Sequence, residues 1–292
     1  MKALTLNAPA KLNLTLDILR RRADGYHDLE MVMFSVDLCD RVTVRLREDG
    51  NILVRAPGTD LPAGEDNLAG KAARAFFNET GSTPGADITL EKRIPAQAGM
   101  GGGSSDAAAV LRALRALTAP ALPLRRLEEL GAQIGSDVPY CVHGGTVLAQ
   151  GRGERLTDWP DVPPCAIVVC KPDFGLSTPA LFGRVRVDAL GPRPDHGAML
   201  RALRAGDLSA AAAQAVNVFE EVLTPKEGET IHAIRRQMLA CGALAARMTG
   251  SGPTVFGLFR QAEDAARAFK ALCPRFSQTF LTRPLAAPAG EV

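Results

Sequence analysis

The segment Pro95-Ala96-Gln97-Ala98-Gly99-Met100-Gly101-Gly102-Gly103-Ser104-Ser105-Asp106 is followed directly by a helical pattern of residues. Four glycines in the five positions 99–103 allow the backbone to approach a ligand closely and to adopt positive φ angles. A glycine-rich turn that opens a helix presents unpaired N–H groups and the positive end of the helix dipole, and both attract phosphate. We therefore predict that residues 95–105 bind phosphate, with hydroxyl donors from Ser104 and Ser105. A flexible loop with a serine cap is the plainer alternative.

This loop departs from the two commonest nucleotide-binding motifs. The sequence contains no G-x-x-x-x-G-K-[ST], which is the Walker A motif. Gly99-x-Gly101 is followed by Ser104, where a dinucleotide-binding fingerprint requires a third Gly or Ala. The class of phosphate-binding protein must therefore be judged from the rest of the chain.

Periodicity on both sides of the loop predicts an α+β fold. The alternation from Leu12 to Ile18 has a period of two, which indicates a half-buried strand, and an Asp24-Gly25 turn separates it from the next. Strands precede helices without a regular β–α alternation, which is typical of the α+β class. We expect further strands near residues 29–36, 42–46, 52–54, 88–90, 147–150, 166–170 and 255–259, and helices near residues 67–77, 107–117, 127–134, 200–215, 230–239 and 262–272.

Proline density rises at residues 159–164, and we place a domain boundary there. The two predicted domains are residues 1–160 and residues 161–292. A chain of this length is long enough for two ordinary domains.

The composition excludes several classes of protein. Apolar residues make up 46% of the 292 residues and charged residues 23%, which is typical of a folded protein and not of a disordered one. Lys and Arg exceed Asp and Glu by 34 − 32 = 2, which gives no general electrostatic reason to bind nucleic acid or an anionic membrane. No apolar run reaches the ~18 residues of a membrane span. We therefore expect a soluble protein with neither a nucleic-acid nor a membrane partner.

The cysteines and histidines show no metal-binding pattern. Six cysteines are scattered without a C-x-x-C pair, which indicates reduced thiols and not a disulfide framework or a zinc site. His143, His196 and His232 also lack ligand spacing. A signal peptide would need a longer apolar stretch than the N-terminal one, which Asn7 and Lys11 interrupt, so we expect a cytoplasmic location. The sequence does not reveal the oligomeric state.

Lys11 and Asp137 are the candidate catalytic residues. Lys11 lies within a predicted strand, where a charge that protects a sheet edge is the simpler interpretation. Asp137 follows Gly135-Ser136, where a helix N-cap is the simpler interpretation. Together with a phosphate-binding loop they would form a working set, because a carboxylate can accept a hydroxyl proton while an ammonium group stabilises its charge.

Residues 95–107 resemble the signature P-x-x-x-G-L-G-G-G-S-S-D/N-A of the GHMP superfamily of small-molecule kinases, with Met100 in place of the usual Leu. Further segments occur in the order expected for the branch that phosphorylates 4-diphosphocytidyl-2-C-methyl-D-erythritol, so the resemblance spans nearly the whole chain. These segments are residues 9–14, 22–27, 135–139 and 248–253. The resemblance implies an N-terminal domain like the second domain of ribosomal protein S5, a ferredoxin-like C-terminal domain, and an active site between them.

The resemblance also implies an activity: ATP-dependent phosphorylation of the 2-hydroxyl of 4-diphosphocytidyl-2-C-methyl-D-erythritol, in non-mevalonate isoprenoid precursor biosynthesis. Mg²⁺ would accompany ATP, with Ser105 as the one candidate ligand and the other metal ligands unknown. By resemblance, residues 95–105 bind ATP, and Lys11 and Asp137 are the catalytic pair. The implied substrate-binding residues are Asn13, Tyr26, His27, Thr178 and Phe182.

Within that set, Tyr26 would stack on the cytosine, His27 would hydrogen-bond its edge, and Phe182 would complete the sandwich. From the residues alone, Tyr26 could equally be a rim aromatic and Phe182 a core residue. Residues 249–253 would either close over the substrate diphosphate or back the nucleotide loop, although a tight turn is the simpler interpretation.

One segment departs from the family pattern. Asn217-Val218-Phe219-Glu220 stands where the family usually has Asn-Asp-Leu/Phe-Glu, so we assign it no role in catalysis. The nearest alternative function is a GHMP kinase for another small alcohol, such as mevalonate or homoserine. A more distant one is an S5-like RNA-binding module, against which the low net charge and the scarcity of aromatics argue.

Overall fold

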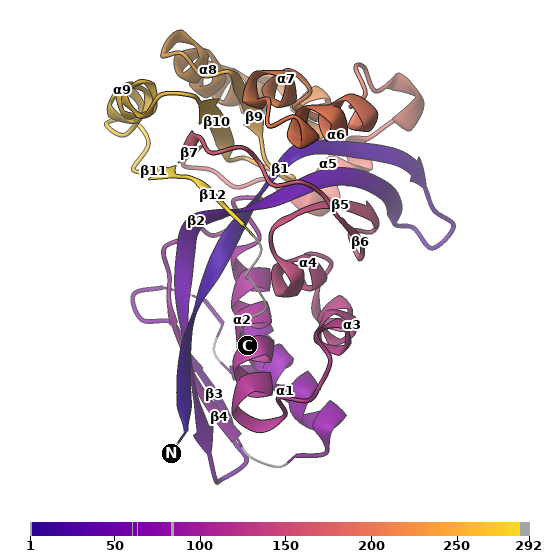
Figure 1. Cartoon of the computed structure of the whole chain (residues 1–292), viewed down its shortest axis with the longest axis vertical. Coiled ribbons are helices and arrows are strands. Elements are labelled where there is room, and N and C mark those ends of the chain that lie inside the picture. The colour runs from indigo at the N-terminus through magenta and orange to yellow at the C-terminus, as the bar shows by residue number, and fades with distance from the viewer. Residues whose placement is uncertain (1, 60, 63, 83–84, 287–292) are drawn as a thin grey trace.

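The chain folds around two β-sheets in the computed structural model, which describes residues 2–59, 61–62, 64–82 and 85–286 (Figure 1). The larger sheet has eight strands, five of which follow the order β3-β4-β2-β1-β8. β5 pairs with β2 and β6, and β12 pairs with β2. Its strands are β1 (Ala3–Arg21), β2 (His27–Arg47), β3 (Ile52–Arg55), β4 (Gly85–Glu91), β5 (Thr146–Gly151), β6 (Arg155–Asp158), β8 (Val216–Asn217) and β12 (Pro284–Leu285).

Strands β1 and β2 form one long antiparallel hairpin that runs from the lower to the upper part of the molecule in Figure 1. The prediction of separate strands at residues 29–36 and 42–46 was wrong, because β2 contains both. The partner of β1 changes from Cys39 at Pro9 to Val36 at Ala10, so residues 37–38 form a bulge and not a loop. A bulge breaks the period of two without ending the strand, and the sequence pattern alone does not distinguish the two cases.

Three helices pack directly on one face of the larger sheet in its lower part, and a fourth, α3, packs on the other three (Figure 1). Asn67 caps the first of them, because its side chain accepts a hydrogen bond from the backbone N–H of Ala69, as its position predicted. Apolar side chains of α1 and α2, such as Phe76 and Val110, are fully buried against the sheet. These helices are α1 (Leu68–Thr80), α2 (Gly102–Thr118), α3 (Leu124–Ile134) and α4 (Val138–His143), and a 3₁₀ turn η1 (Gly64–Asp66) precedes them.

The smaller sheet is antiparallel, with the order β11-β7-β10-β9. The succession β7–α8–β9–β10–α9–β11 is the split β-α-β arrangement of ferredoxin-like folds, as expected. Its strands are β7 (Ala166–Lys171), β9 (Ala245–Met248), β10 (Val255–Phe259) and β11 (Gln278–Thr282). Its helices are α5 (Thr178–Arg184), α6 (His196–Arg204), α7 (Leu208–Ala213), α8 (Pro225–Ala240) and α9 (Ala262–Leu272), with 3₁₀ turns η2 (Val187–Ala189) and η3 (Val218–Val222).

The predicted helix over residues 200–215 is divided into α6 and α7. Gly206 separates them with a φ of 66°, a left-handed conformation that glycine adopts without strain. The division of this helix does not change the fold class, and the α+β class is confirmed. β8 and β12 come from beyond residue 160 and pair with the larger sheet, so later parts of the chain tie the two sheets together. The division at residue 160 stays a prediction.

Among the residues that the structure describes, no helix combines the length and the apolar character that a membrane span requires.

Candidate active site

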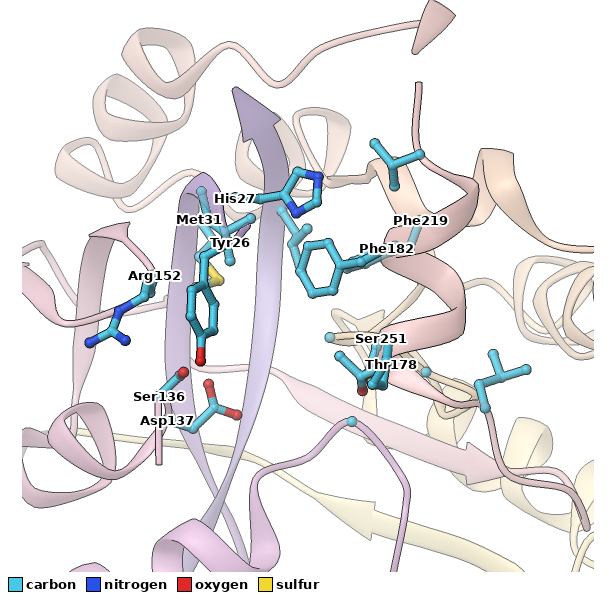
Figure 2. Close-up of a pocket in the computed structure, with 18 of the residues that line it drawn as sticks. Tyr26, His27, Met31, Ser136, Asp137, Arg152, Thr178, Phe182, Phe219 and Ser251 are labelled. Atoms are coloured by element: carbon cyan, nitrogen blue, oxygen red, sulfur yellow. The ribbon is translucent and has the colours of Figure 1, made fainter. Parts of the chain in front are cut away.

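A cleft of about 830 Å³ lies where the glycine-rich loop, the tip of the β1–β2 hairpin and helix α5 meet. Its lining combines groups that the sequence places far apart, and Figure 2 shows the side chains that point into it. The lining residues used below are Lys11, Arg21, Tyr26, His27, Met31, Gln97, Gly99, Gly101, Ser104, Ser136, Asp137, Arg152, Thr178, Phe182, Phe219, Gly250, Ser251 and Gly252.

The glycine-rich loop opens α2, as predicted, but its glycines adopt different conformations. Gly99 and Gly101 both have a φ of 72°, and Gly101 is the N-cap of the helix. Gly102 and Gly103 already belong to α2. The unpaired N–H groups of the first helical turn therefore begin at the wall of the cleft.

The predicted ATP-binding residues divide into three groups. Those that line the cleft are Gln97, Gly99, Gly101 and Ser104. Ala98, Met100 and Ser105 are buried, and the Ser105 hydroxyl donates to the carbonyl of Pro9 at 2.7 Å. Pro95 is also buried, and Ala96, Gly102 and Gly103 neither line the cleft nor are buried.

Lys11 and Asp137 face each other beside this loop. The Lys11 Nζ atom lies 3.6 Å from Asp137 Oδ2, and the lysine side chain is only 4% exposed. Such burial excludes the interpretation of Lys11 as a solvated edge charge. Asp137 occupies the N-cap position of α4 but its side chain caps no N–H, so it is available to the cleft. The structure thus brings together the two residues that the sequence paired only by hypothesis.

Asn13 holds the side chain of Lys11 in place through a hydrogen bond. Its Oδ1 atom accepts hydrogen bonds from Lys11 Nζ at 2.9 Å, from the N–H of Gly250 at 2.9 Å and from Thr249 Oγ1 at 3.2 Å. Asn13 is fully buried and is not among the lining residues, although we predicted it to bind substrate. Its side chain instead connects the lysine to the loop at residues 249–252.

The loop at residues 249–252 packs directly against the glycine-rich loop. A Cβ atom on Gly99 would lie 2.4 Å from the carbonyl oxygen of Thr249 and 2.9 Å from the N of Gly252. Ser251 reaches the cleft, where its hydroxyl shares a 2.6 Å hydrogen bond with Thr178 Oγ1 at the start of α5. Thr178, which we predicted to bind substrate, lines the cleft beside a serine that our residue set omitted.

The segment at residues 217–220 anchors the same loop. The Asn217 amide donates to the carbonyls of Met248 at 2.7 Å and Gly250 at 2.9 Å, and its Oδ1 accepts from the N–H of Phe219. Glu220 accepts from the N–H of Met248 and pairs with Arg235. Val218, which replaces the usual Asp, is fully buried among apolar residues. The Asn and Glu of this segment thus support the loop, while the position of the missing Asp is part of the core.

Aromatic side chains gather at the other end of the cleft. Tyr26 stands on the hairpin tip with 55% of its surface exposed, and Phe182 lies across the cleft from it (Figure 2). The His27 ring stacks on Phe182 with a centroid distance of 4.8 Å and an interplanar angle of 16°, and Phe219 packs edge-on to Phe182 at 4.9 Å. Burial, with a smaller contribution from Arg21, lowers the pKa of His27, so its ring is neutral at pH 7. In this conformation the His27 ring covers one face of the Phe182 ring.

A buried charge cluster lies under the glycine-rich loop. Lys92 Nζ contacts one carboxylate oxygen of Asp40 and one of Asp106, and the other Asp40 oxygen accepts from the N–H groups of Arg93 and Ile94. Burial raises the pKa of Asp106, and the neighbouring Asp40 adds to the rise while Lys92 opposes it. Through Lys92, which follows β4, the cluster ties Asp40 of β2 to Asp106 of α2.

The sequence reasoning gave no role to Ser136 and Arg152, which also line the cleft. Ser136 was visible only as the neighbour of Asp137. Arg152 stands between two glycines, which is a turn signal, but nothing in the sequence indicates that this turn meets the hairpin tip at Tyr26.

Comparison with known proteins places this site in a family. Two family models match the chain: "GHMP kinases N terminal domain" over residues 67–145 and "GHMP kinases C terminal" over residues 199–278. A protein of Brevibacillus brevis named 4-diphosphocytidyl-2-C-methyl-D-erythritol kinase is 42% identical over 289 residues, which is 99% of each chain. The chain belongs to the GHMP kinase family. As a GHMP kinase it is an ATP-dependent phosphotransferase.

Solved structures of GHMP kinases agree with this assignment. A crystal structure of 4-(cytidine 5'-diphospho)-2C-methyl-D-erythritol kinase has a TM-score of 0.82 and 34% identity, and covers 96% of this chain and 99% of its own. Homoserine kinase from Cytophaga hutchinsonii has a TM-score of 0.75 at 19% identity, over 98% and 96% of the two chains. The second likeness shows the shared GHMP kinase fold alone.

Proposed function

We propose that this GHMP kinase transfers the γ-phosphoryl group of ATP to the 2-hydroxyl of 4-diphosphocytidyl-2-C-methyl-D-erythritol, a step in non-mevalonate isoprenoid precursor biosynthesis. The observation that carries the proposal is that one cleft joins the Lys11–Asp137 pair to an aromatic slot at Tyr26 and Phe182. The names of the relatives support the same substrate.

In this proposal Asp137 accepts the proton of the substrate hydroxyl as the oxygen attacks phosphorus. Lys11, held by Asn13, neutralises charge on the carboxylate and on the transferring phosphoryl group. Phosphoryl transfer requires little covalent chemistry from a protein, so positioning and charge stabilisation supply most of the rate. The attacking oxygen takes the phosphoryl group, ADP leaves, and the proton resides on Asp137 until it exchanges with water.

The glycine-rich loop binds the triphosphate of ATP. The φ of 72° at Gly99 and Gly101 turns the backbone so that α2 begins at the cleft, where the helix dipole favours the negative charge. Ser104, on the first turn of α2, adds a hydroxyl that faces the cleft. The buried Lys92 cluster anchors α2 to β2 just after this turn.

Mg²⁺ would accompany ATP in this site. Within the described residues no group of three or more His, Cys, Asp and Glu side chains could hold a metal ion, so the chain offers no preformed cage. Mg²⁺ commonly binds through substrate phosphates, water and one or two protein oxygens, and the cleft offers the Ser104 hydroxyl for this purpose. When bound, the ion neutralises charge on the phosphates. The Ser105 hydroxyl is buried against Pro9 and suits this role less well than Ser104.

The cytosine of the substrate lies between Tyr26 and Phe182. His27 must leave its stack on Phe182 to admit the base, and its neutral ring can then hydrogen-bond the base edge. Thr178 and Ser251 lie next to each other below Phe182, on the side of the cleft opposite Asp137, where hydroxyl groups suit a diphosphate or a polyol (Figure 2). Mevalonate and homoserine carry no base, so a kinase for either would have no use for the slot.

The test is a coupled ADP-release assay with alcohols that carry or lack the cytidine diphosphate group. We expect turnover with the cytidyl substrate and about a hundredfold or greater loss of kcat/KM for 2-C-methylerythritol 4-phosphate, mevalonate and homoserine, because remote binding energy is lost with the base. Equal turnover of mevalonate or homoserine would transfer the proposal to that alcohol. The cytoplasmic location and the absence of a nucleic-acid partner stay predictions.

A further inference from the structure

We propose that Arg152 is a positioning residue for the cytidyl group, because it fixes the ring of Tyr26 as one wall of the base slot, which is the aromatic slot between Tyr26 and Phe182. The guanidinium carbon of Arg152 lies 5.3 Å from the centroid of the Tyr26 ring, which is the geometry of a cation–π contact. Figure 2 shows Arg152 on one side of Tyr26 and Phe182 on the other, so the arginine leaves the cleft-facing side of the ring to the base. The inference rests on the proposed function.

Tyr26 needs such support because of where it stands. It follows a hairpin turn at Gly25, the residue is 55% exposed, and its backbone N–H donates a hydrogen bond of 3.1 Å to the carboxylate of Asp24. That hydrogen bond fixes the backbone but not the ring. A side chain that must be ordered by the ligand reduces the ligand's affinity, whereas a ring already held in place does not.

Arg152 is itself held by a rigid turn between β5 and β6. Gly151 and Gly153 flank it with φ values of 74° and 115°, and its own N–H donates to Glu154 Oε2 at 2.6 Å. A Cβ atom on Gly153 would lie 3.1 Å from Met31 Cε, so the turn is packed against the hairpin strands. The backbone from which the arginine side chain extends is therefore held in a defined position beside the hairpin.

Asp24 lies close enough to Arg152 for their opposite charges to interact. The hydrogen bond from Arg22 is the main reason that the pKa of Asp24 lies below its usual value, and the charge of Arg152 adds to the effect. Asp24 thus links both halves of the contact, because it holds the N–H of Tyr26 and attracts the guanidinium that covers the ring. The pair forms before any ligand arrives.

The test compares KM values for 4-diphosphocytidyl-2-C-methyl-D-erythritol and for ATP in Arg152→Ala, Arg152→Lys and Arg155→Ala. A cation–π contact at an exposed site accounts for a change of about two- to fivefold, so Arg152→Ala is expected to raise KM for the cytidyl substrate by that factor. We expect kcat and the KM for ATP to stay constant, and Arg152→Lys to show a smaller rise because it keeps a cation. Arg155→Ala, an exposed arginine of the same hairpin outside the cleft, is the matched control and is expected to leave all three values unchanged.

A double variant separates an action through Tyr26 from a direct action on the ligand. If Arg152 acts through the ring, Arg152→Ala adds nothing once Tyr26→Ala is present. Effects that multiply in the double variant, or an unchanged KM in Arg152→Ala alone, would overturn the inference while the base slot stands. An unchanged KM in Tyr26→Ala alone would overturn the base slot as well, so the two failures are distinguishable.

Discussion

Lys11 Nζ and Asp137 Oδ2 lie 3.6 Å apart, although 125 residues separate them in the chain. The lysine comes from the long strand β1 and the aspartate from the turn before α4, and a Cβ atom on Gly101 would lie 3.1 Å from Lys11 Cγ and 3.8 Å from Asp137 Oδ2. The ion pair and the N-cap of the glycine-rich loop therefore form one compact unit. A substitution at Asp137 tests the ion pair, and a substitution at Gly101 tests the loop.

The first prediction concerns Asp137→Asn. The amide has the shape of the carboxylate but cannot accept the hydroxyl proton, so kcat should fall by ~10²–10⁴. The KM values for ATP and for the alcohol should stay within several-fold, because Asp137 makes no capping hydrogen bond on which the fold depends. Steady-state kinetics for both substrates provides the measurement. A kcat near that of the wild type would show that Asp137 is only the start of a helix.

The second prediction concerns Gly101→Val. A side chain at Gly101 is disfavoured by its φ of 72° and would press on Lys11, so ATP binding should be lost. The matched control is Gly103→Ala, because Gly103 is helical and its added methyl would meet only Leu68 Cδ1 at an ordinary 3.5 Å. Calorimetric titration with ATP should detect no binding in the first variant and near-normal affinity in the second. Undiminished affinity in a folded Gly101→Val protein would reduce the loop to a linker.

Local sequence patterns predicted the features that depend on local structure. The glycine-rich loop, the helix after it and the Asn67 cap follow from neighbouring residues, and they are present. The GHMP resemblance added the pairing of Lys11 with Asp137 and the gathering of Tyr26 with Phe182 in one cleft.

Features that depend on contacts between distant segments were not predictable from local pattern. Asn13 bonds to Gly250, 237 residues away, and this bond explains why a residue expected to touch the substrate is buried. The contact of Arg152 with Tyr26 also joins two turns far apart in the chain. Periodicity reports which face of an element is buried but not which element covers it.

The third prediction concerns Tyr26→Ala, which removes one wall of the base slot. Stacking on an aromatic ring contributes ~1–3 kcal/mol per base, so KM for the cytidyl substrate should rise about ten- to hundredfold while KM for ATP barely changes. Tyr26→Phe keeps the ring and serves as the control. Free CDP should compete with the alcohol substrate and not with ATP. A change in the KM for ATP alone would mean that the two nucleotide sites have been interchanged.

The fourth prediction concerns pH and His143, the last residue of α4. Hydrogen bonds to Glu128 and then to Asp158 raise the pKa of His143 to about 9 from an ordinary 6.5. A raised pKa means that the protonated form stabilises the fold, fully below pH 6.5 and no longer above about pH 9. His143→Gln should therefore be less stable than the wild type by about 1 kcal/mol at pH 6, and the difference should vanish as the pH passes 9. Urea unfolding across this range measures it, with the exposed His232→Gln as control. A difference that does not vary with pH would contradict the ion-pair origin.

The last prediction gives the segment at residues 217–220 a measurable role. Asn217→Asp replaces the amide that donates to the carbonyls of Met248 and Gly250 with a second oxygen, so the loop must move away. Because Gly250 also donates to Asn13, which holds Lys11, the movement should reach the catalytic lysine and lower kcat by about 10- to 100-fold.

Lost stability alone could mimic this result, and Glu220→Gln provides the comparison. That variant keeps an acceptor for the N–H of Met248 but weakens the ion pair with Arg235, so it should lower the melting temperature with little effect on kcat. Both variants are assayed well below their melting temperatures. If kcat falls equally in the two, the segment only stabilises the fold; a fall confined to Asn217→Asp shows that hydrogen bonds from Asn217 set the position of Lys11 through the loop at residues 248–250.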